Sequence, residues 1–447
     1  MASFTDRYEL SLSTSSAAAA ELYSRAVDFA LASDSPAEAT FDDAIAADEG
    51  FALPHAGKAR LAQFRGDAAT ARAEVDRARE LGAGASRREQ QHIESLAAAI
   101  GGDSPRALVL LHEHIAEFPR DAFVLSQACG VYGLIGFSGR TTRNDEQLAL
   151  VEGVAEAYGE DWWFLSQHAF ALNELFRHEE ARDLTERSLR QNARNGHASH
   201  VMSHVHYETG DVAGGVAFLN DWMPGYNPGA QLFGHLNWHL ALFELAAGNT
   251  ERALEVYSTV LRPPGPPGAT ALGVIADSSA LLWRAAISGV DPESLPWSDV
   301  AEFAARSFPR PAITWADMHC ALAYAGANDS ARLGQHIDAL RERVEAGKVV
   351  AGPMVVKLAE GIAAYGAGDY ETAVSLLEPI AAEVIRIGGS HAQRDVFEET
   401  LLESYLRAGC FEQAEALLSA RLDRRPSPRD EAWFTRLHAT KMRAAQA

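Results

Sequence analysis

A short pattern that recurs along the chain constrains its fold more than any other feature. Each copy has a Gly, then a small residue five positions later, then a larger apolar residue four positions further on. The copies begin at Gly66, Gly210, Gly248, Gly368 and Gly409, and the residue after each Gly is Asp, Asn or Cys. A Gly of this kind ends a helix in the left-handed conformation, the next residue starts a second helix, and the small residue lets the two helices pack closely. The pattern is therefore typical of helical hairpins.

The segments around these copies support an all-α fold. Proline stops a helix, and Pro119, Pro263 and Pro426 stand where the second helices of hairpins should end. Alternating β-branched segments are scarce, whereas Ala, Leu, Glu and Arg dominate the periodic stretches. The repeats are somewhat longer than the roughly 34 residues of a tetratricopeptide unit. We predict an α-solenoid of tetratricopeptide-like hairpins that forms a right-handed superhelix with a concave pocket.

We expect one continuous solenoid over residues 1–447. The Pro-rich segment 262–268 cannot be helical, and residues 140–145 form a lesser break. Neither needs to be a domain boundary, because each hairpin exposes an apolar face that the next hairpin covers. Three sub-regions follow from the pattern: N-terminal repeats in 1–125, His-rich central repeats in 126–330 and C-terminal repeats in 331–447.

The charge balance and the cysteines exclude several classes of protein. The 39 Lys and Arg against 61 Asp and Glu give a net charge of −22, which repels nucleic-acid phosphates and anionic membrane surfaces. The sequence has no run of about 18 apolar residues, so no membrane-spanning helix is predicted. The first residues do not resemble a signal peptide. The three Cys never form a CxxC pair, so neither disulfides nor thiolate zinc sites are expected. We expect a cytoplasmic protein that binds neither nucleic acid nor membrane.

Histidines gather on two of the predicted helices. The helix before Gly210 carries His197, His200, His204 and Glu208, which the helical period places within about 80° of one another. The helix before Gly248 carries His235 and His239, one turn apart. First helices of stacked hairpins lie about 8–10 Å apart, so imidazoles from both helices can approach one point.

These histidines predict either a metal site or an ordinary structural cluster. Two His one helical turn apart suit bidentate chelation of a transition metal such as Zn²⁺ or Fe²⁺. The candidate metal ligands are His200, His204, His235 and His239. Glu208 or Asp277 would then serve as a carboxylate ligand or as a base. Alternatively, the histidines pack on neighbouring helices through ordinary hydrogen bonds. The zinc-protease motif is absent, because Val201 follows the first His of the pair.

A third cluster follows two glycines, in residues 388–395. Ser390 is a good helix cap, so His391 and Arg394 are expected at the positive end of a helix, where they can meet an anion. Alternatively, Arg394 and Asp395 pair with neighbouring side chains.

Four single residues complete the candidate site. Asp277 either caps the helix after the Pro-rich segment or orients a histidine. His319 lies among small apolar residues, where an imidazole needs a partner. His197 and Trp238 are neighbours of the paired histidines in the sequence and are predicted to contact a substrate.

Taken in order, these motifs resemble those of the tetratricopeptide repeat protein 38 family. The matching segments are residues 87–92, 200–205, 234–239, 277–284, His319 and residues 389–395, and they extend over most of the chain. The resemblance implies an atypical tetratricopeptide array and brings no established reaction, substrate or metal. His197 stands where the family more often has an aromatic residue, and His206 adds a further imidazole nearby.

The leading functional hypothesis is a protein that processes a small molecule in the concave pocket, as a metal-dependent hydrolase, lyase or transferase. The catalytic candidates are Asp277, His319, His391 and Glu208, and the substrate-binding candidates are Arg394, Asp395, Trp238 and His197. A metal-free version would use His as general acid and base. The alternative is a scaffold that binds a peptide or protein partner along an open groove without catalysis. A homodimer, in which a second copy of the chain is the partner, is a further hypothesis.

Overall fold

The fold is helical almost throughout. The computed structural model describes residues 4–444, and within them the strands are β1 (Phe4–Thr5) and β2 (Ser11–Leu12), which form one short antiparallel pair. No helix in this part of the chain is long and apolar enough to cross a membrane. The predicted all-α solenoid of helical hairpins is confirmed.

The helices follow one another in antiparallel pairs. The N-terminal helices are α1 (Ala17–Leu31), α2 (Ala37–Ala47), α3 (Ala52–Arg65), α4 (Ala68–Gly82), α5 (Arg87–Ile100) and α6 (Ser104–Glu117). The central helices are α7 (Ala122–Leu125), α8 (Arg143–Glu152), α9 (Ala155–Tyr158), α10 (Trp162–Asn173), α11 (His178–Gln191), α12 (Gly196–Glu208), α13 (Val212–Trp222), α14 (Phe233–Ala246) and α15 (Thr250–Val256), which continues as the π-helix η1 (Tyr257–Leu261).

The C-terminal part contains two 3₁₀ segments among its helices. Its elements are α16 (Ala271–Ile287), η2 (Pro292–Ser294), α17 (Trp297–Ser307), α18 (Thr314–Gly326), α19 (Ser330–Glu345), α20 (Met354–Gly366), α21 (Tyr370–Leu377), η3 (Glu378–Ile387), α22 (His391–Ala408), α23 (Phe411–Arg424) and α24 (Pro428–Ala444).

The predicted hairpin turns have the expected backbone and caps. The turn glycines Gly66, Gly210, Gly248, Gly368 and Gly409 all have φ between +69° and +83°. Asp67, Asp211 and Asp369 then cap the second helices, because each side chain accepts a backbone N–H of the first turn. The small residue of every copy is buried. Local sequence therefore defines these five hairpins.

The five copies do not include every hairpin turn of the structure. Gly102 joins α5 to α6 with a φ of +84°, and Asp103 caps α6, so this turn fits the pattern and was missed. Phe176 joins α10 to α11 and Asn328 joins α18 to α19, with φ values of +61° and +54°. A left-handed residue that is not Gly is uncommon, so a pattern built on Gly does not detect it.

The two predicted interruptions have different outcomes. Residues 262–268 lie between η1 and α16 and are not helical, as predicted. The break at 140–145 is shorter than predicted, because α8 begins at Arg143. Pro119, Pro263 and Pro426 each follow the end of a helix within two residues.

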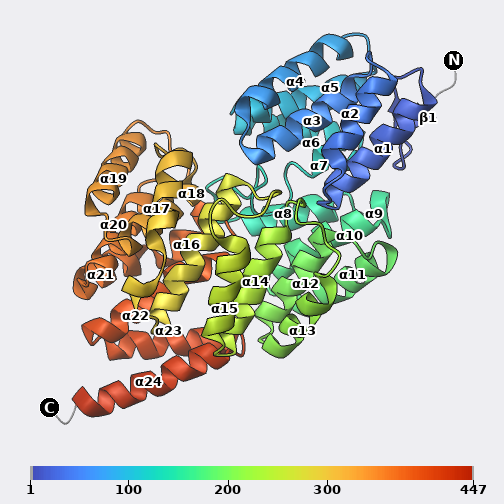
Figure 1. The fold of residues 1–447 in the computed structure, drawn as a ribbon. Coiled ribbons are helices and arrows are strands. Elements are labelled where there is room, and N and C mark those ends of the chain that lie inside the picture. Colours follow the sequence, from blue (N-terminus) through green and yellow to red (C-terminus); the bar gives the residue numbers. More distant parts are fainter. Residues whose placement is uncertain (1–3, 445–447) are drawn as a thin grey trace.

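The helices form three groups around two large apolar cores. In Figure 1, α1–α6 (blue) form one group beside the central helices α10–α15 (green), and α16–α21 (yellow to orange) lie on the other side of the central helices. One core draws its buried residues from 8–205 and the other from 219–437, and Phe218 packs against both. Helix α22 packs against α12, α16 and α20, so residues near 391 come close to the His-rich helices.

The buried small residues of the repeat pattern should not tolerate a larger side chain. Ala71 is 1% exposed within α4, which packs against α3, so Ala71→Leu should lower the free energy of unfolding by about 1–3 kcal/mol. Urea denaturation followed by circular dichroism measures this loss. Ala69→Leu on the exposed face of the same helix is the matched control and should change stability by less than about 0.5 kcal/mol. Equal losses in the two variants would contradict the packing role.

Candidate metal centre

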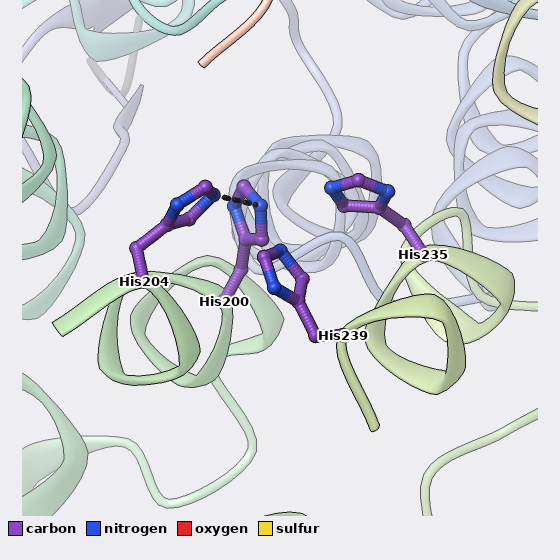
Figure 2. Close-up of side chains that lie close together, drawn as sticks. All are labelled: His200, His204, His235 and His239. Carbon is purple, nitrogen blue, oxygen red and sulfur yellow. Dashed lines mark hydrogen bonds between the residues drawn. The ribbon is translucent and has the colours of Figure 1, made fainter. Parts of the chain in front are cut away.

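Four of the 16 histidines converge on one point between two helices. His200 and His204 lie one turn apart on α12, and His235 and His239 lie one turn apart on α14. These are the first helices of neighbouring hairpins, and α12 contacts α14 directly. Figure 2 shows the four rings on the same side of the two helices, pointing toward one another.

The four imidazoles are close enough to share one ion. One ring nitrogen from each of the four lies within 4.8 Å of the others. The ring centroids of His200 and His204 are 4.5 Å apart, those of His204 and His239 4.6 Å, and those of His235 and His239 4.9 Å. A tetrahedral zinc ion places its ligand nitrogens about 3.4 Å apart, so side-chain shifts of about an ångström would bring three or four of these nitrogens to coordinating distance.

Burial keeps most of these imidazoles neutral. Burial, reinforced by the neighbouring imidazoles, lowers the pKa values of His200, His204 and His239 well below the usual range. At neutral pH these three side chains therefore carry lone pairs rather than charges, and the neutral imidazole is the form that binds metals.

The hydrogen bonds within the group leave several nitrogens without partners. Nε2 of His204 and Nε2 of His200 lie 2.9 Å apart, so one of them donates to the other. Both ring nitrogens of His239, and Nδ1 of His204, are buried and have no hydrogen-bond partner in the structure. A buried polar group without a partner is costly, and its presence calls for a ligand or a functional explanation. His239 therefore argues against the alternative of ordinary structural hydrogen bonding.

Asp277 fixes the orientation of one imidazole. The Nδ1–H of His235 donates to the two carboxylate oxygens of Asp277, each at 3.0 Å. This bond leaves Nε2 of His235 with its lone pair, as in the carboxylate–histidine pairs that support metal ligands. Asp277 lies in the middle of α16, which Thr270 caps, so Asp277 orients a histidine and is not the helix cap. The donor set, its burial and this supporting carboxylate fit a transition metal.

A cavity of about 170 Å³ adjoins the histidines. His200 and His235 line it, together with Asp277, whereas His204 and His239 lie behind them. The walls come from α1, α3, α10, α12, α14 and α16, and from the segments around residues 130 and 266. Most of the lining residues are apolar.

Two predicted substrate-binding residues take different positions at this cavity. His197 lines it, and its Nε2 lies 2.9 Å from the hydroxyl of Ser33. Burial lowers the pKa of His197 to about 4. Trp238 does not line the cavity: it is 1% exposed and stacks on His235 at a centroid distance of 5.1 Å. Trp238 therefore supports a ring of the cluster rather than contacting a substrate.

Glu208 does not join the four histidines, in contrast to the stripe predicted for α12. Its carboxylate pairs with Arg425 at 3.1 Å, and burial raises its pKa. The last turn of α12 faces the C-terminal helices, so the predicted role as metal ligand or base does not fit its position. Asp395 lies in the same ion-pair cluster: Tyr207 donates to it at 2.8 Å, and Arg421 pairs with it at 3.1 Å. Although burial opposes ionisation, these arginines hold the pKa of Asp395 well below its usual range.

His391 and Arg394 lie at the start of α22, as predicted, but line a second cavity of about 380 Å³ instead of the first. The imidazole Nε2–H of His391 donates to the carbonyl of Glu174 at 3.1 Å. Arg394 donates to the carbonyl of Gly389 and lies 3.7 Å from the Glu174 carboxylate. From the predicted third cluster, the side chain that reaches the first cavity is Gln393, which also donates to the hydroxyl of Tyr132 at 3.1 Å.

His319 has the partner that its surroundings require. Its Nδ1–H donates to the carbonyl of Trp315 at 2.7 Å, and its ring packs between Trp315 and Phe397. It lines neither cavity, so the structure separates it from the four histidines.

Sequence reasoning missed two sets of buried polar residues. Arg421 and Arg425 hold the ion-pair cluster that contains Glu208 and Asp395. In the N-terminal group, the carboxylate of Asp121 accepts from Arg88 at 2.7 Å, His92 at 3.0 Å and His114 at 3.1 Å. Arg88 and His92 lie in the segment 87–92 named above, but no motif spacing connects them with Asp121 and His114, so only the tertiary structure identifies the cluster.

Comparison with known proteins adds little beyond the helical architecture. No family model matches the chain. It is similar to the crystal structure of yeast Tom70, at 12% identity, with 96% of each chain covered and a TM-score of 0.32. It is also similar to the TPR domain of P58(IPK), at 16% identity, with 90% of this chain and 89% of that chain covered and a TM-score of 0.23. Both TM-scores are low, so the hairpin architecture rests on the helices described above.

The structural role of His319 predicts a pH-dependent stability. Burial lowers its pKa to about 4, whereas an unfolded histidine titrates near pH 6.5. Between these values the unfolded chain binds a proton that the folded chain excludes, so this group lowers the free energy of unfolding as the pH falls, by about 1.4 kcal/mol per pH unit. His319→Gln keeps a donor for the carbonyl of Trp315 and should flatten the profile by about that slope. Urea denaturation between pH 6.5 and pH 4 tests this, and an unchanged slope would contradict it.

Proposed function

We propose that this protein binds a transition metal through His200, His204, His235 and His239 and uses it to process a small molecule in the adjoining cavity. The observation that carries the proposal is the convergence of four imidazoles, of which His204 and His239 are fully buried. Neither ring nitrogen of His239 has a hydrogen-bond partner among the described residues. Zn²⁺ and Fe²⁺ are the candidate ions, because both accept imidazole nitrogen.

The residues around the cavity support a hydrolase, lyase or transferase rather than a structural metal site. Structural sites are closed, whereas His200 and His235 line a cavity that can admit a substrate. A metal held by three of the four imidazoles would keep one position open, where it would supply Lewis-acid polarisation of a substrate oxygen. Asp277 holds His235 in the metal-binding tautomer, and most of the residues that line the cavity are apolar. His197 suits hydrogen bonding to the substrate better than proton abstraction, because a base with a pKa of about 4 is weak at neutral pH.

The resemblance to the tetratricopeptide repeat protein 38 family belongs to the same proposal. Three of its matching segments, 200–205, 234–239 and 277–284, lie within α12, α14 and α16, the helices that supply the histidines and Asp277. A cytoplasmic location and a homodimer stay predictions from the sequence.

Elemental analysis tests the metal centre directly. Protein purified without a His tag should contain near-stoichiometric zinc or iron, and the His200→Ala/His239→Ala variant should lose it while remaining folded by circular dichroism. His112→Ala, on the exposed face of α6, is the control and should retain the metal. If the wild-type protein stays metal-free after incubation with Zn²⁺ or anaerobic Fe²⁺, the proposal is wrong.

The supporting carboxylate gives a finer test. Asp277→Asn keeps a group of the same shape but removes the negative charge beside His235, so the affinity for Zn²⁺ should fall by about 10- to 100-fold. Competition with a chromogenic chelator measures the change. Asp317→Asn alters a buried carboxyl on α18 that contacts none of the four histidines and should leave zinc affinity unchanged. Equal affinities in wild type and Asp277→Asn would remove Asp277 from the site.

Partner binding is the second candidate function, because an array of helical hairpins offers extended surfaces between its repeats. The net charge of −22 favours a basic peptide as the partner. This candidate requires no metal, so a metal-free wild-type protein that captures basic peptides in a salt-sensitive manner would favour it over the metal-dependent function.

A further inference from the structure

Arg60 is a buried cation without a buried acid beside it. It lies on α3, is 7% exposed and lines the same cavity as His200 and His235. Its one hydrogen bond runs from Nη1 to the side-chain oxygen of Gln63, at 2.7 Å, and its Nε is buried with no partner. No carboxylate within residues 4–444 forms an ion pair with it.

Most other buried arginines of this protein pair with acids, and Arg143, which does not, donates to the backbone carbonyls of Gly136 and Gly389. Arg88 pairs with Asp121 at 2.7 Å, and Arg425 pairs with Glu208 at 3.1 Å and with Asp395. A buried charge without a counter-charge is strongly unfavourable, and Arg60 has neither an acid nor a backbone carbonyl as its partner and lines the cavity. Burial lowers its pKa to about 10, which still leaves the guanidinium protonated at neutral pH.

The surroundings of Arg60 hold the guanidinium at the cavity. Its Cζ lies 4.1 Å from the centroid of the Phe64 ring, a cation–π contact that restricts the side chain. The charged side chains that line the cavity are Arg60 and Asp277, and His235 already partners Asp277. The guanidinium is therefore the charge that remains available to a ligand.

The rest of the lining selects apolar groups. It includes Leu31, Phe64, Phe123, Phe170 and Val274, with a few hydrogen-bonding side chains among them. A single guanidinium neutralises one negative charge, so a phosphate dianion would bring a second charge into an apolar cavity without compensation. A planar carboxylate instead matches the two-pronged geometry of arginine.

We infer that the cavity takes a mostly apolar small molecule with one carboxylate, which pairs with Arg60. The apolar end of this molecule would face the four histidines, and that part of the inference rests on the proposed function. Recognition of the carboxylate by Arg60 does not depend on the proposed function. The substrate class is therefore an apolar monocarboxylic acid, such as an alkyl or aryl acid.

Binding of octanoate, compared with octanamide and octylamine, tests this inference by isothermal titration calorimetry. The protein is first stripped of metal with a chelator and measured without added ions, and then again with Zn²⁺. Octanoate should bind at least about tenfold more tightly than octanamide in both states, because the amide has the same shape but no charge. Stronger binding of octylamine, or equal affinity for octanoate and octanamide, would overturn the inference.

Variants on α3 assign the effect to one side chain. Arg60→Gln should weaken octanoate by about tenfold or more and leave octanamide unchanged, while Arg60→Lys, which keeps the charge, should retain part of the preference. Arg65→Gln is the matched control, because Arg65 is exposed on the same helix and pairs with Glu38. If Arg60→Gln does not fold, the wild-type comparison of octanoate with octanamide and the Arg60→Lys variant still decide the question.

The results that would contradict this inference differ from those that would contradict the proposed metal centre. If no acid from butyrate to dodecanoate, nor phenylacetate, binds the wild-type protein, the carboxylate assignment is wrong even where zinc is bound stoichiometrically. If octanoate binds through Arg60 and no metal is found, the carboxylate site stands and the proposed metal chemistry does not.

Discussion

The candidate metal centre depends on how closely α13 packs against α14. Gly215 on α13 occupies the position that is Ala in the other sequence repeats, and a Cβ there would lie 2.5 Å from the ring of Phe243. Phe243 follows His239 by one turn of α14. The missing methyl group thus lets the ring of Phe243 settle against α13 and sets the distance at which α14 meets the rest of the repeat array. Helix α12 contacts both α13 and α14, so this packing contributes to the position of His239 opposite the histidines of α12.

The buried polar clusters of this protein differ in whether their charged and hydrogen-bonding groups have partners. Around Asp121, and around Asp395, carboxylates pair with arginines or histidines in the interior. Such clusters join helices that are distant in the sequence, and removing one member would leave a buried charge exposed to an apolar environment. The four histidines and Arg60 differ, because within residues 4–444 no carboxylate pairs with Arg60 and neither ring nitrogen of His239 has a hydrogen-bond partner. His239 and Arg60 both lie at or beside one cavity, where an interior polar group can find its partner in a ligand.

The sequence predicted those parts of the structure that local rules control. Five hairpin turns follow from Gly and its neighbours, and the pairing of His200 with His204 and of His235 with His239 follows from the helical period and the equivalence of hairpins. Glu208 departed from the predicted stripe because its environment is set by Arg425, more than two hundred residues away in the sequence. Its neighbours in the sequence suggest that Trp238 contacts a substrate, whereas the packing of α14 buries it.

Arg60 shows why part of the candidate site cannot be predicted from the sequence. The sequence has many arginines and no motif around this one, so nothing local distinguishes it from the solvent-exposed Arg65. Its significance arises from two properties of the folded chain, burial and the lack of an acidic neighbour. Both depend on how α3 meets helices that lie much later in the sequence.

The position of the first cavity links the two apolar cores. Phe123 and Phe170 belong to the core of residues 8–205, Leu261 and Val274 belong to the core of residues 219–437, and all four line the cavity. A molecule that fills the cavity therefore touches both cores at once, and its binding free energy is lost if either core opens. A ligand in the cavity would couple the unfolding of the two cores, so that they unfold as one cooperative unit. The ligand then acts as a removable part of the protein interior.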